Sequence, residues 1–273
     1  MNEVNGTTQP KLRVIDSHAV VSLKATIGNG VRIDAFAVIE DDVVIGDDCW
    51  IGANAVIANG TRMGKENRIF PMASIGNEPQ DLKYHGEPTT LEMGDRNVVR
   101  EFVTLNRGTS ETARTIIQND CLFMAYAHVG HDCRVGNRVI LANNVALGGH
   151  VHINDWAIIG GGTPVHQFCK IGEHAMIGGG FRVVKDVPPF ILAGQEPLVF
   201  EGLNSIGLRR RGFEPDVIAT LERAYEILYR SNLNVSQAVA KIKEQVPMIP
   251  VVESLLGFIG RSKRGIISGR ARH

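Results

Sequence analysis

Residues 27–57 read IGNGVRIDAFAVIEDDVVIGDDCWIGANAVI, with an isoleucine at every sixth position. The register extends from Ile15 to Val183, and 26 of its 29 positions are apolar. A hydrophobic content of 44% would place about 13 apolar residues there by chance. Because a period of six fits neither a helix nor simple alternation, it predicts a short strand and a corner, repeated along the chain.

Three such units close a triangular coil of about 18 residues, and stacked coils form parallel sheets about 4.8 Å apart. The sequence therefore predicts a mainly β protein, a parallel β-helix of hexapeptide repeats, over residues 12–190. A small α-helical domain is predicted over residues 191–273, because the register stops at Pro188-Pro189. Three helices are expected there, beginning at Pro215, near Asn234 with a capping box to Gln237, and after Pro250.

Two further positions of the hexad have a consistent composition. The residue after the register position is glycine twelve times, which we interpret as a corner that requires a positive φ. The fourth residue after the register position is often alanine and includes all four cysteines. We expect these cysteines to be small buried wall residues rather than disulfide partners or metal ligands.

Two polar interruptions break the repeat at residues 76–91 and 106–115, and they contain its three exceptions, Asp81, Glu87 and Glu111. The register returns in phase after each interruption. We therefore predict two loops extruded from single coils. Loops held by a rigid scaffold often carry function.

The 29 basic and 29 acidic residues cancel, which argues against bulk attraction to nucleic acid or to an anionic membrane. No apolar run approaches the roughly 20 residues of a membrane span. The polar segment Met1–Lys11 also lacks the apolar core of a secretory signal. We expect a cytoplasmic protein without a nucleic-acid partner and without stable membrane insertion.

The histidines indicate a site. One coil of about 18 residues places His131 beside His150, and a second places both near His166, so three imidazoles are predicted to form one column. A neutral imidazole is suited to general-base catalysis near neutral pH. Asp132 could orient His131, and a backbone N–H at Gly148-Gly149 in the neighbouring coil could stabilise an oxyanion. A zinc site shared between the subunits of a carbonic anhydrase-like trimer is the alternative.

Seven motifs carry a resemblance to a known family. In chain order they are ASIGNEPQDLKYHGEPT at 73–89, RGT at 107–109, AHVGHDCRVGN at 127–137, LANN at 141–144, GGHV at 148–151, VHQFCKIG at 165–172 and GLRRRGF at 207–213. With these motifs the chain resembles the LpxA family, the acyl-[acyl-carrier-protein]–UDP-N-acetylglucosamine O-acyltransferases. The hexad is common to many acyltransferases, whereas QDLKY, AHVGHDC and RRRGF in this order are specific.

The resemblance implies a left-handed β-helix and a homotrimer. It also implies transfer of an (R)-3-hydroxyacyl chain to the 3-position of UDP-N-acetylglucosamine, the first step of lipid A biosynthesis. No cofactor is implied, because the acyl chain arrives on the phosphopantetheine of acyl carrier protein. His131 would be the general base, supported by Asp132, with the Gly149 amide as the oxyanion contact.

The remaining implied roles concern substrate binding. Asp81, Lys83, His128, His150, His166 and Gln167 would bind or position the sugar and phosphate groups, and Asn204, Arg210 and Arg211 would contact the nucleotide. Guanidinium groups suit pyrophosphate through paired hydrogen bonds. Gly179 stands where family members measure acyl-chain length, and a glycine there leaves the groove open for a longer chain.

Two positions depart from the family pattern. Asn106 replaces a histidine and could allow a 3-amino sugar analogue as acceptor, a second alternative. Ile206 replaces a carboxylate that often helps to bind the nucleotide.

Overall fold

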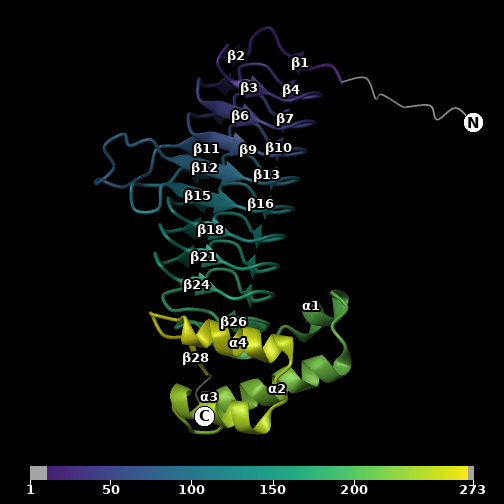
Figure 1. Ribbon diagram of the computed structural model, residues 1–273, viewed down its shortest axis with the longest axis vertical. Helices are drawn as coiled ribbons and strands as arrows, with labels where there is room; N and C mark the ends of the chain where they lie inside the picture. The colour runs from purple at the N-terminus through teal and green to yellow at the C-terminus, as the bar shows by residue number, and fades with distance from the viewer. Residues whose placement is uncertain (1–10, 270–273) are drawn as a thin grey trace, which may run out of the picture.

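The computed structural model describes residues 11–269. It is a tall column of stacked coils, with four helices at the C-terminal end and two loops projecting from the side of the column near β11, β12 and β15 (Figure 1). Most of the segment Met1–Lys11 and the last four residues of the predicted helical domain lie outside the described residues. Within residues 11–269, no helix has the length and hydropathy of a membrane span.

Three sheets form the faces of the column, and their strands pair in parallel except for β26 and β27, which are antiparallel. Sheet A contains β1 (Val14–Ile15), β4 (Arg32–Ile33), β7 (Trp50–Ile51), β10 (Arg68–Ile69), β13 (Val98–Val99), β16 (Leu122–Phe123), β19 (Ile140–Leu141), β22 (Ile158–Ile159), β25 (Met176–Ile177), β26 (Ile191–Gly194), β27 (Val199–Leu203) and β28 (Ser268–Gly269). Sheet B contains β2 (Val20–Val21), β5 (Val38–Ile39), β8 (Val56–Ile57), β11 (Ser74–Asn77), β14 (Thr104–Asn106), β17 (His128–Val129), β20 (Ala146–Leu147) and β23 (Pro164–Val165). Sheet C contains β3 (Thr26–Ile27), β6 (Val43–Ile45), β9 (Thr61–Met63), β12 (Thr90–Met93), β15 (Arg114–Ile117), β18 (Arg134–Val135), β21 (His152–Ile153) and β24 (Lys170–Ile171).

The register residues fill the interior of the column, as predicted. From Ile33 to Val183 those on strands are at most 4% exposed, and all four cysteines are buried and free. The chain passes from sheet A to B to C and back to A, so the column has three edges, which we call the A–B, B–C and C–A edges. The predicted parallel β-helix of hexapeptide repeats is confirmed.

Both interruptions insert whole hexads, which explains why the register survives them. Val56 pairs with Ser74, 18 residues on, whereas Ser74 pairs with Thr104 after 30 residues and Thr104 with His128 after 24. The coils therefore gain 12 and then 6 residues. The loops, residues 78–89 and 107–113, are narrower than predicted, because the flanking strands extend into the interruptions.

The interpretation of the glycine position is wrong. Of the twelve glycines only Gly76 has a positive φ, and along the column positive φ occurs two residues later, at residues of many types such as Phe36, Asp48 and Asn54. The glycines instead permit close stacking of successive coils: a Cβ on Gly46 would lie 2.6 Å from the carbonyl carbon of Gly64 in the next coil. The small residue is selected by contact between coils rather than by backbone conformation.

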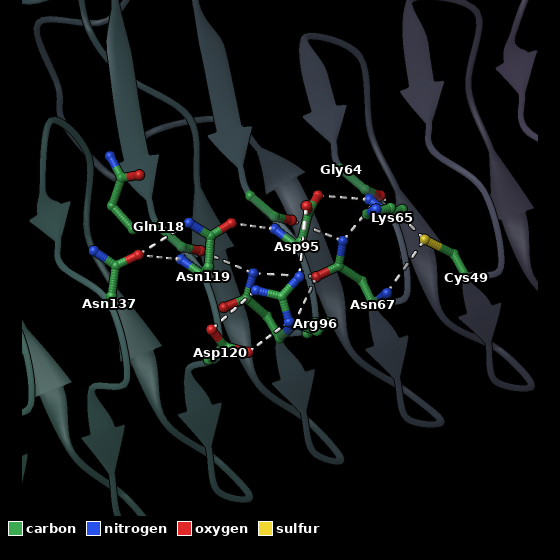
Figure 2. Close-up of polar contacts among 12 residues, drawn as sticks. Cys49, Gly64, Lys65, Asn67, Asp95, Arg96, Gln118, Asn119, Asp120 and Asn137 are labelled. Atoms are coloured by element: carbon green, nitrogen blue, oxygen red, sulfur yellow. Dashed lines mark hydrogen bonds and ion pairs between the residues drawn. The ribbon is translucent and has the colours of Figure 1, made fainter.

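A ladder of hydrogen bonds runs along the C–A edge (Figure 2). The Lys65, Asp95 and Asn119 amides each donate to a side-chain oxygen one coil further on, at 2.8–3.2 Å. Inside this edge, the fully buried Asn97 donates to Asn67 at 3.1 Å and to the Gln118 carbonyl at 2.9 Å. Polar groups at these turns are therefore satisfied by the neighbouring coils.

The three predicted helices are confirmed as α2 (Pro215–Arg230), α3 (Val235–Gln245) and α4 (Pro250–Gly260), and Asn234 and Gln237 form the capping box of α3. A short helix, α1 (Ser205–Arg210), was not predicted. Strands β26 and β27 precede it and extend sheet A beyond the predicted boundary at residue 190. Whether 190 divides two domains stays a prediction.

Candidate active site

The B–C edge gathers both loops and the predicted base. Loop 78–89 leaves this edge between β11 and β12, and loop 107–113 leaves it one coil later between β14 and β15. His131 and Asp132 occupy the next corner, between β17 and β18. Residues far apart in the sequence meet here because three successive coils turn at the same edge.

His131 and Asp132 form a hydrogen-bonded pair, with 2.8 Å between His131 Nδ1 and Asp132 Oδ2. Neighbouring side chains on a strand point to opposite faces, but these two residues lie in a corner, where Asp132 has a φ of 59°. The His131 side chain is 14% exposed and that of Asp132 is fully buried. The pair therefore has a buried carboxylate and an accessible imidazole.

Loop 107–113 supplies further hydrogen bonds to this carboxylate. The Thr109 amide donates to Oδ1 of Asp132 at 3.0 Å, the Thr109 hydroxyl donates to Oδ2 at 2.7 Å, and the Thr112 hydroxyl donates to Oδ1. Burial opposes ionisation, but the hydrogen bonds from His131 and both threonines outweigh it and hold the pKa of Asp132 well below its usual range. The hydrogen bond to this carboxylate, opposed in part by burial, raises the pKa of His131.

The other ring nitrogen of His131 faces the first loop. Its Nε2 lies 3.9 Å from Oδ2 of Asp81, whose Oδ1 accepts a hydrogen bond from the Lys83 amide at 3.0 Å. Lys83 itself is exposed. The structure thus brings Asp81 to the histidine and leaves the Lys83 ammonium in solvent.

Gly149 lies directly under the imidazole in the next coil. A Cβ at this position would be 2.5 Å from His131 Nε2, so any side chain would displace the ring. Gly149 is buried, and its N–H donates no hydrogen bond to residues 11–269. A free amide beside the base is available to a ligand.

The predicted column of three imidazoles is wrong in its third member. The rings of His131 and His150 contact edge to face, with centroids 5.2 Å apart, and His150 stacks on Phe168 at 4.5 Å. His166 and Gln167 are exposed, and His166 Nδ1 lies 3.1 Å from the Gln167 carbonyl. Phe168 lies one coil below His150 at the same corner position. His166 is two residues earlier in the chain, so Phe168 takes the place in the column that was predicted for His166.

Two more histidine contacts border this site. His128 lies on the outer face of β17, where its Nδ1 is 2.7 Å from the Thr104 hydroxyl. Burial, with the charge of His131 as a smaller cause, lowers the pKa of His128. His150 Nε2 lies 3.3 Å from Oε2 of Glu111, a register exception on the second loop.

The loops are tied together by residues to which the sequence analysis gave no structural role. Arg107 donates to the Tyr84 hydroxyl at 3.0 Å and to the Gly76 carbonyl at 3.1 Å. Asn106 is buried and donates to the Glu78 carbonyl at 2.8 Å. This departure from the family pattern therefore helps to hold the first loop. No periodicity marks such contacts, because they join two irregular segments.

The remaining predicted residues lie elsewhere in the same chain. Gly179 is exposed on the A–B edge. Asn204 donates to the carbonyl of His174 at 3.0 Å, and Arg211 Nη1 lies 3.0 Å from the His174 ring, on the C–A edge. Arg210 lines a cavity of about 640 Å³ against the outer face of sheet A. These residues do not join His131 within one chain.

His131, Asp132 and His150 could in principle hold a metal ion, because one ligand atom from each lies within 4.8 Å of the others. However, a carboxylate offers about four acceptor positions, and those of Asp132 already receive four hydrogen bonds, one from His131 and three from loop 107–113. A metal would have to displace them. The donor set fits a hydrogen-bonded base better than a zinc ligand.

Comparison with known proteins agrees with this geometry. The hexapeptide transferase repeat matches residues 24–59 and 114–149, and "Udp N-acetylglucosamine O-acyltransferase; Domain 2" matches residues 186–267. The acyl-[acyl-carrier-protein]–UDP-N-acetylglucosamine O-acyltransferase of Herminiimonas arsenicoxydans is 48% identical over 94% of this chain and 100% of its own.

Two solved structures give the same result. LpxA of Bacteroides fragilis superposes with a TM-score of 0.89 at 45% identity, over 92% of this chain and 99% of its own. The Francisella novicida UDP-N-acetylglucosamine acyltransferase gives a TM-score of 0.91 at 39% identity, over 93% and 94% of the two chains. The predicted fold class is confirmed, and neither the zinc alternative nor the 3-amino sugar alternative is favoured. The chain belongs to the LpxA family, the acyl-[acyl-carrier-protein]–UDP-N-acetylglucosamine O-acyltransferases, and is an acyltransferase.

Proposed function

We propose that this protein transfers an (R)-3-hydroxyacyl chain from acyl carrier protein to the 3-hydroxyl of UDP-N-acetylglucosamine, with His131 as the general base. One observation carries the assignment of the base: Asp132 holds Nδ1 of His131 at 2.8 Å, which directs Nε2 into the space between Asp81 and Gly149. An imidazole with one nitrogen held by a carboxylate keeps a basic lone pair on the other.

The reaction follows from this arrangement. Nε2 of His131 removes the proton from the sugar hydroxyl while its oxygen attacks the thioester carbonyl, and the charge develops on the carbonyl oxygen. The free N–H of Gly149 is placed to stabilise that charge. When the carbon–sulfur bond breaks, the proton on Nε2 passes to the phosphopantetheine thiolate, which restores the base. No further cofactor is needed.

The substrate-binding roles divide between the loops and the column. Asp81 and Lys83 would hold the glucosamine and phosphate groups from the first loop, and His128, His150, His166 and Gln167 would contact or position the substrate from the β-helix. Asp81 supports this role by its place 3.9 Å from the catalytic nitrogen.

A homotrimer is supported by what one chain lacks. In a three-sided column, the B–C edge lies opposite sheet A. The nucleotide residues Asn204, Arg210 and Arg211 contact sheet A or the C–A edge, and Gly179 lies on the A–B edge. We propose that sheet A of a neighbouring copy meets the B–C edge, so that each complete site contains residues of two subunits.

The acyl groove would then run along the outer face of sheet A toward Gly179. This face carries an apolar row at Val98, Leu122, Ile140, Ile158, Met176 and Leu192. A row of this kind suits a hydrocarbon chain, and the exposed Gly179 adds no side chain to block it. The proposed setting is the cytoplasm, where acyl carrier protein delivers the thioester.

The test is an assay of the purified protein with hydroxyacyl carrier proteins of several chain lengths and UDP-N-acetylglucosamine. We expect turnover, and we expect His131→Ala to lower kcat by about a thousandfold while the protein stays folded. Near-normal turnover in that variant would contradict the base assignment. The 3-amino analogue serves as the competing acceptor, and exclusive use of it would overturn the proposed sugar.

A further inference from the structure

The second loop is held by the catalytic carboxylate. Three of the four hydrogen bonds to Asp132 come from loop 107–113, through the Thr109 amide, the Thr109 hydroxyl and the Thr112 hydroxyl. Thr109 is buried and Thr112 is half-buried. These contacts are therefore shielded from water.

The donors distinguish the two oxygens of Asp132. Oδ1 receives only loop donors, whereas Oδ2 receives the Thr109 hydroxyl and His131 Nδ1. A carboxylate with donors on both oxygens cannot rotate without losing several hydrogen bonds at once. The loop thereby fixes the oxygen that orients the base.

The two hydroxyls are committed to this carboxylate. The Thr112 hydroxyl has one proton and also lies 3.0 Å from the Arg114 carbonyl, but an ionised acceptor forms the stronger hydrogen bond. The Thr109 hydroxyl donates to Oδ2 and accepts from the Glu111 amide at 3.2 Å. The loop's own turn thus sets the direction of the Thr109 proton.

The next two corners of this edge, which carry no insertion, lack such donors. In the next coils, His150 and Phe168 occupy the position of Asp132, and no inserted residues precede them there. The six residues added to the coil above Asp132 are what brings the donors to it. This insertion is otherwise unexplained by the column's packing.

We propose that Thr109 and Thr112 are positioning residues for acyl transfer, which hold the Asp132 carboxylate and limit its pull on the His131 proton. The proposal rests on His131 being the base. Without one hydroxyl donor, the charge of Asp132 is less dispersed and attracts the Nδ1 proton more strongly. His131 then stays protonated, and inactive as a base, to higher pH.

The test compares Thr109→Val and Thr112→Val with the wild-type enzyme. For each we measure kcat and the KM for UDP-N-acetylglucosamine across pH, together with an NMR titration of the His131 ring. We expect kcat to fall about tenfold with little change in KM, and the acid limb of kcat and the ring titration to move upward by about half a pH unit. The serine variants should restore both, because serine keeps the donor.

Thr220→Val is the matched control, because its hydroxyl donates to the Asp216 carbonyl at 2.7 Å within α2, far along the chain from the site. An unchanged acid limb and ring titration in the site variants would overturn the proposal. So would losses that serine does not restore, since these would indicate a packing role. His131→Ala separates the two claims. If this variant is inactive and the threonine variants behave like the wild-type enzyme, only the positioning role is rejected. If His131→Ala is active, the assignment of His131 as the base is rejected.

Discussion

The C–A and B–C edges use the same corner for opposite purposes. At the C–A edge, turn amides such as those of Lys65 and Asp95 donate to side chains of the next coil. At the B–C edge, the equivalent amide of Gly149 has no partner within residues 11–269. A buried donor without a partner costs stability. The comparison shows that these C–A turns satisfy their amides from the next coil, whereas the turn at Gly149 leaves an amide open to a substrate.

The difference extends to side chains. The C–A edge buries Asn67 and Asn97 in a ladder between coils, whereas the B–C edge extrudes two loops over His131 and Asp132. The hydrogen-bonded ladder along the C–A edge keeps the coils in register. The B–C edge, where the loops leave the column, accommodates insertions. Stability and chemistry are thus separated on one repeated scaffold.

The sharpest way to break the comparison is to place an alanine at the equivalent corner position of each edge. Gly149→Ala puts a methyl group within 2.5 Å of His131 Nε2, so we expect kcat to fall by about a hundredfold or more. Lys65→Ala, which keeps the backbone amide of the C–A ladder, should leave kcat unchanged. Steady-state kinetics of both variants test this, and equal effects would show that the edges do not differ in function.

A smaller effect is expected from the charge at the B–C edge. His131 acts as a base only when neutral, and Asp132 raises its pKa, so kcat should decline as pH falls through a value above that of an ordinary imidazole. Asp132→Asn removes the charge and should move this acid limb down by about one unit, opposite to the threonine variants. A pH profile of kcat measures the shift. An unchanged or raised limb would contradict the pairing.

The smallest catalytic effect should come from the C–A ladder. Asn97→Ala leaves the Cys121 amide and the Gln118 carbonyl unpaired, which should cost about 3 kcal/mol of unfolding free energy. Below the melting temperature, kcat should stay within about twofold of wild type. Denaturant unfolding and kinetics measure the two quantities. Arg96→Ala, which removes an exposed ion pair with Asp120, is the control and should lower the unfolding free energy far less.

Much of the architecture was predictable because a hexad places one apolar residue in the interior at each repeat, and the interior accepts little else. The helices at Pro215, Asn234 and Pro250 were predictable for a similar reason, since their first residues cap or begin a helix locally. Helix α1 was missed because six residues provide no periodicity. The column of His131, His150 and Phe168 was predicted only in part, since spacing alone does not decide which side chains turn to the same side.

The sequence by itself determined the coil, the two whole-hexad insertions and the pairing of a histidine with a neighbouring carboxylate as a candidate base. Only the tertiary structure decided that the glycines serve close stacking, that both loops leave the B–C edge, and that Thr109 and Thr112 hold Asp132. The physical reason is that periodicity records which residues face the interior of the same column. Contacts made across an edge by irregular loops depend on where each coil turns, and no spacing in the chain records that.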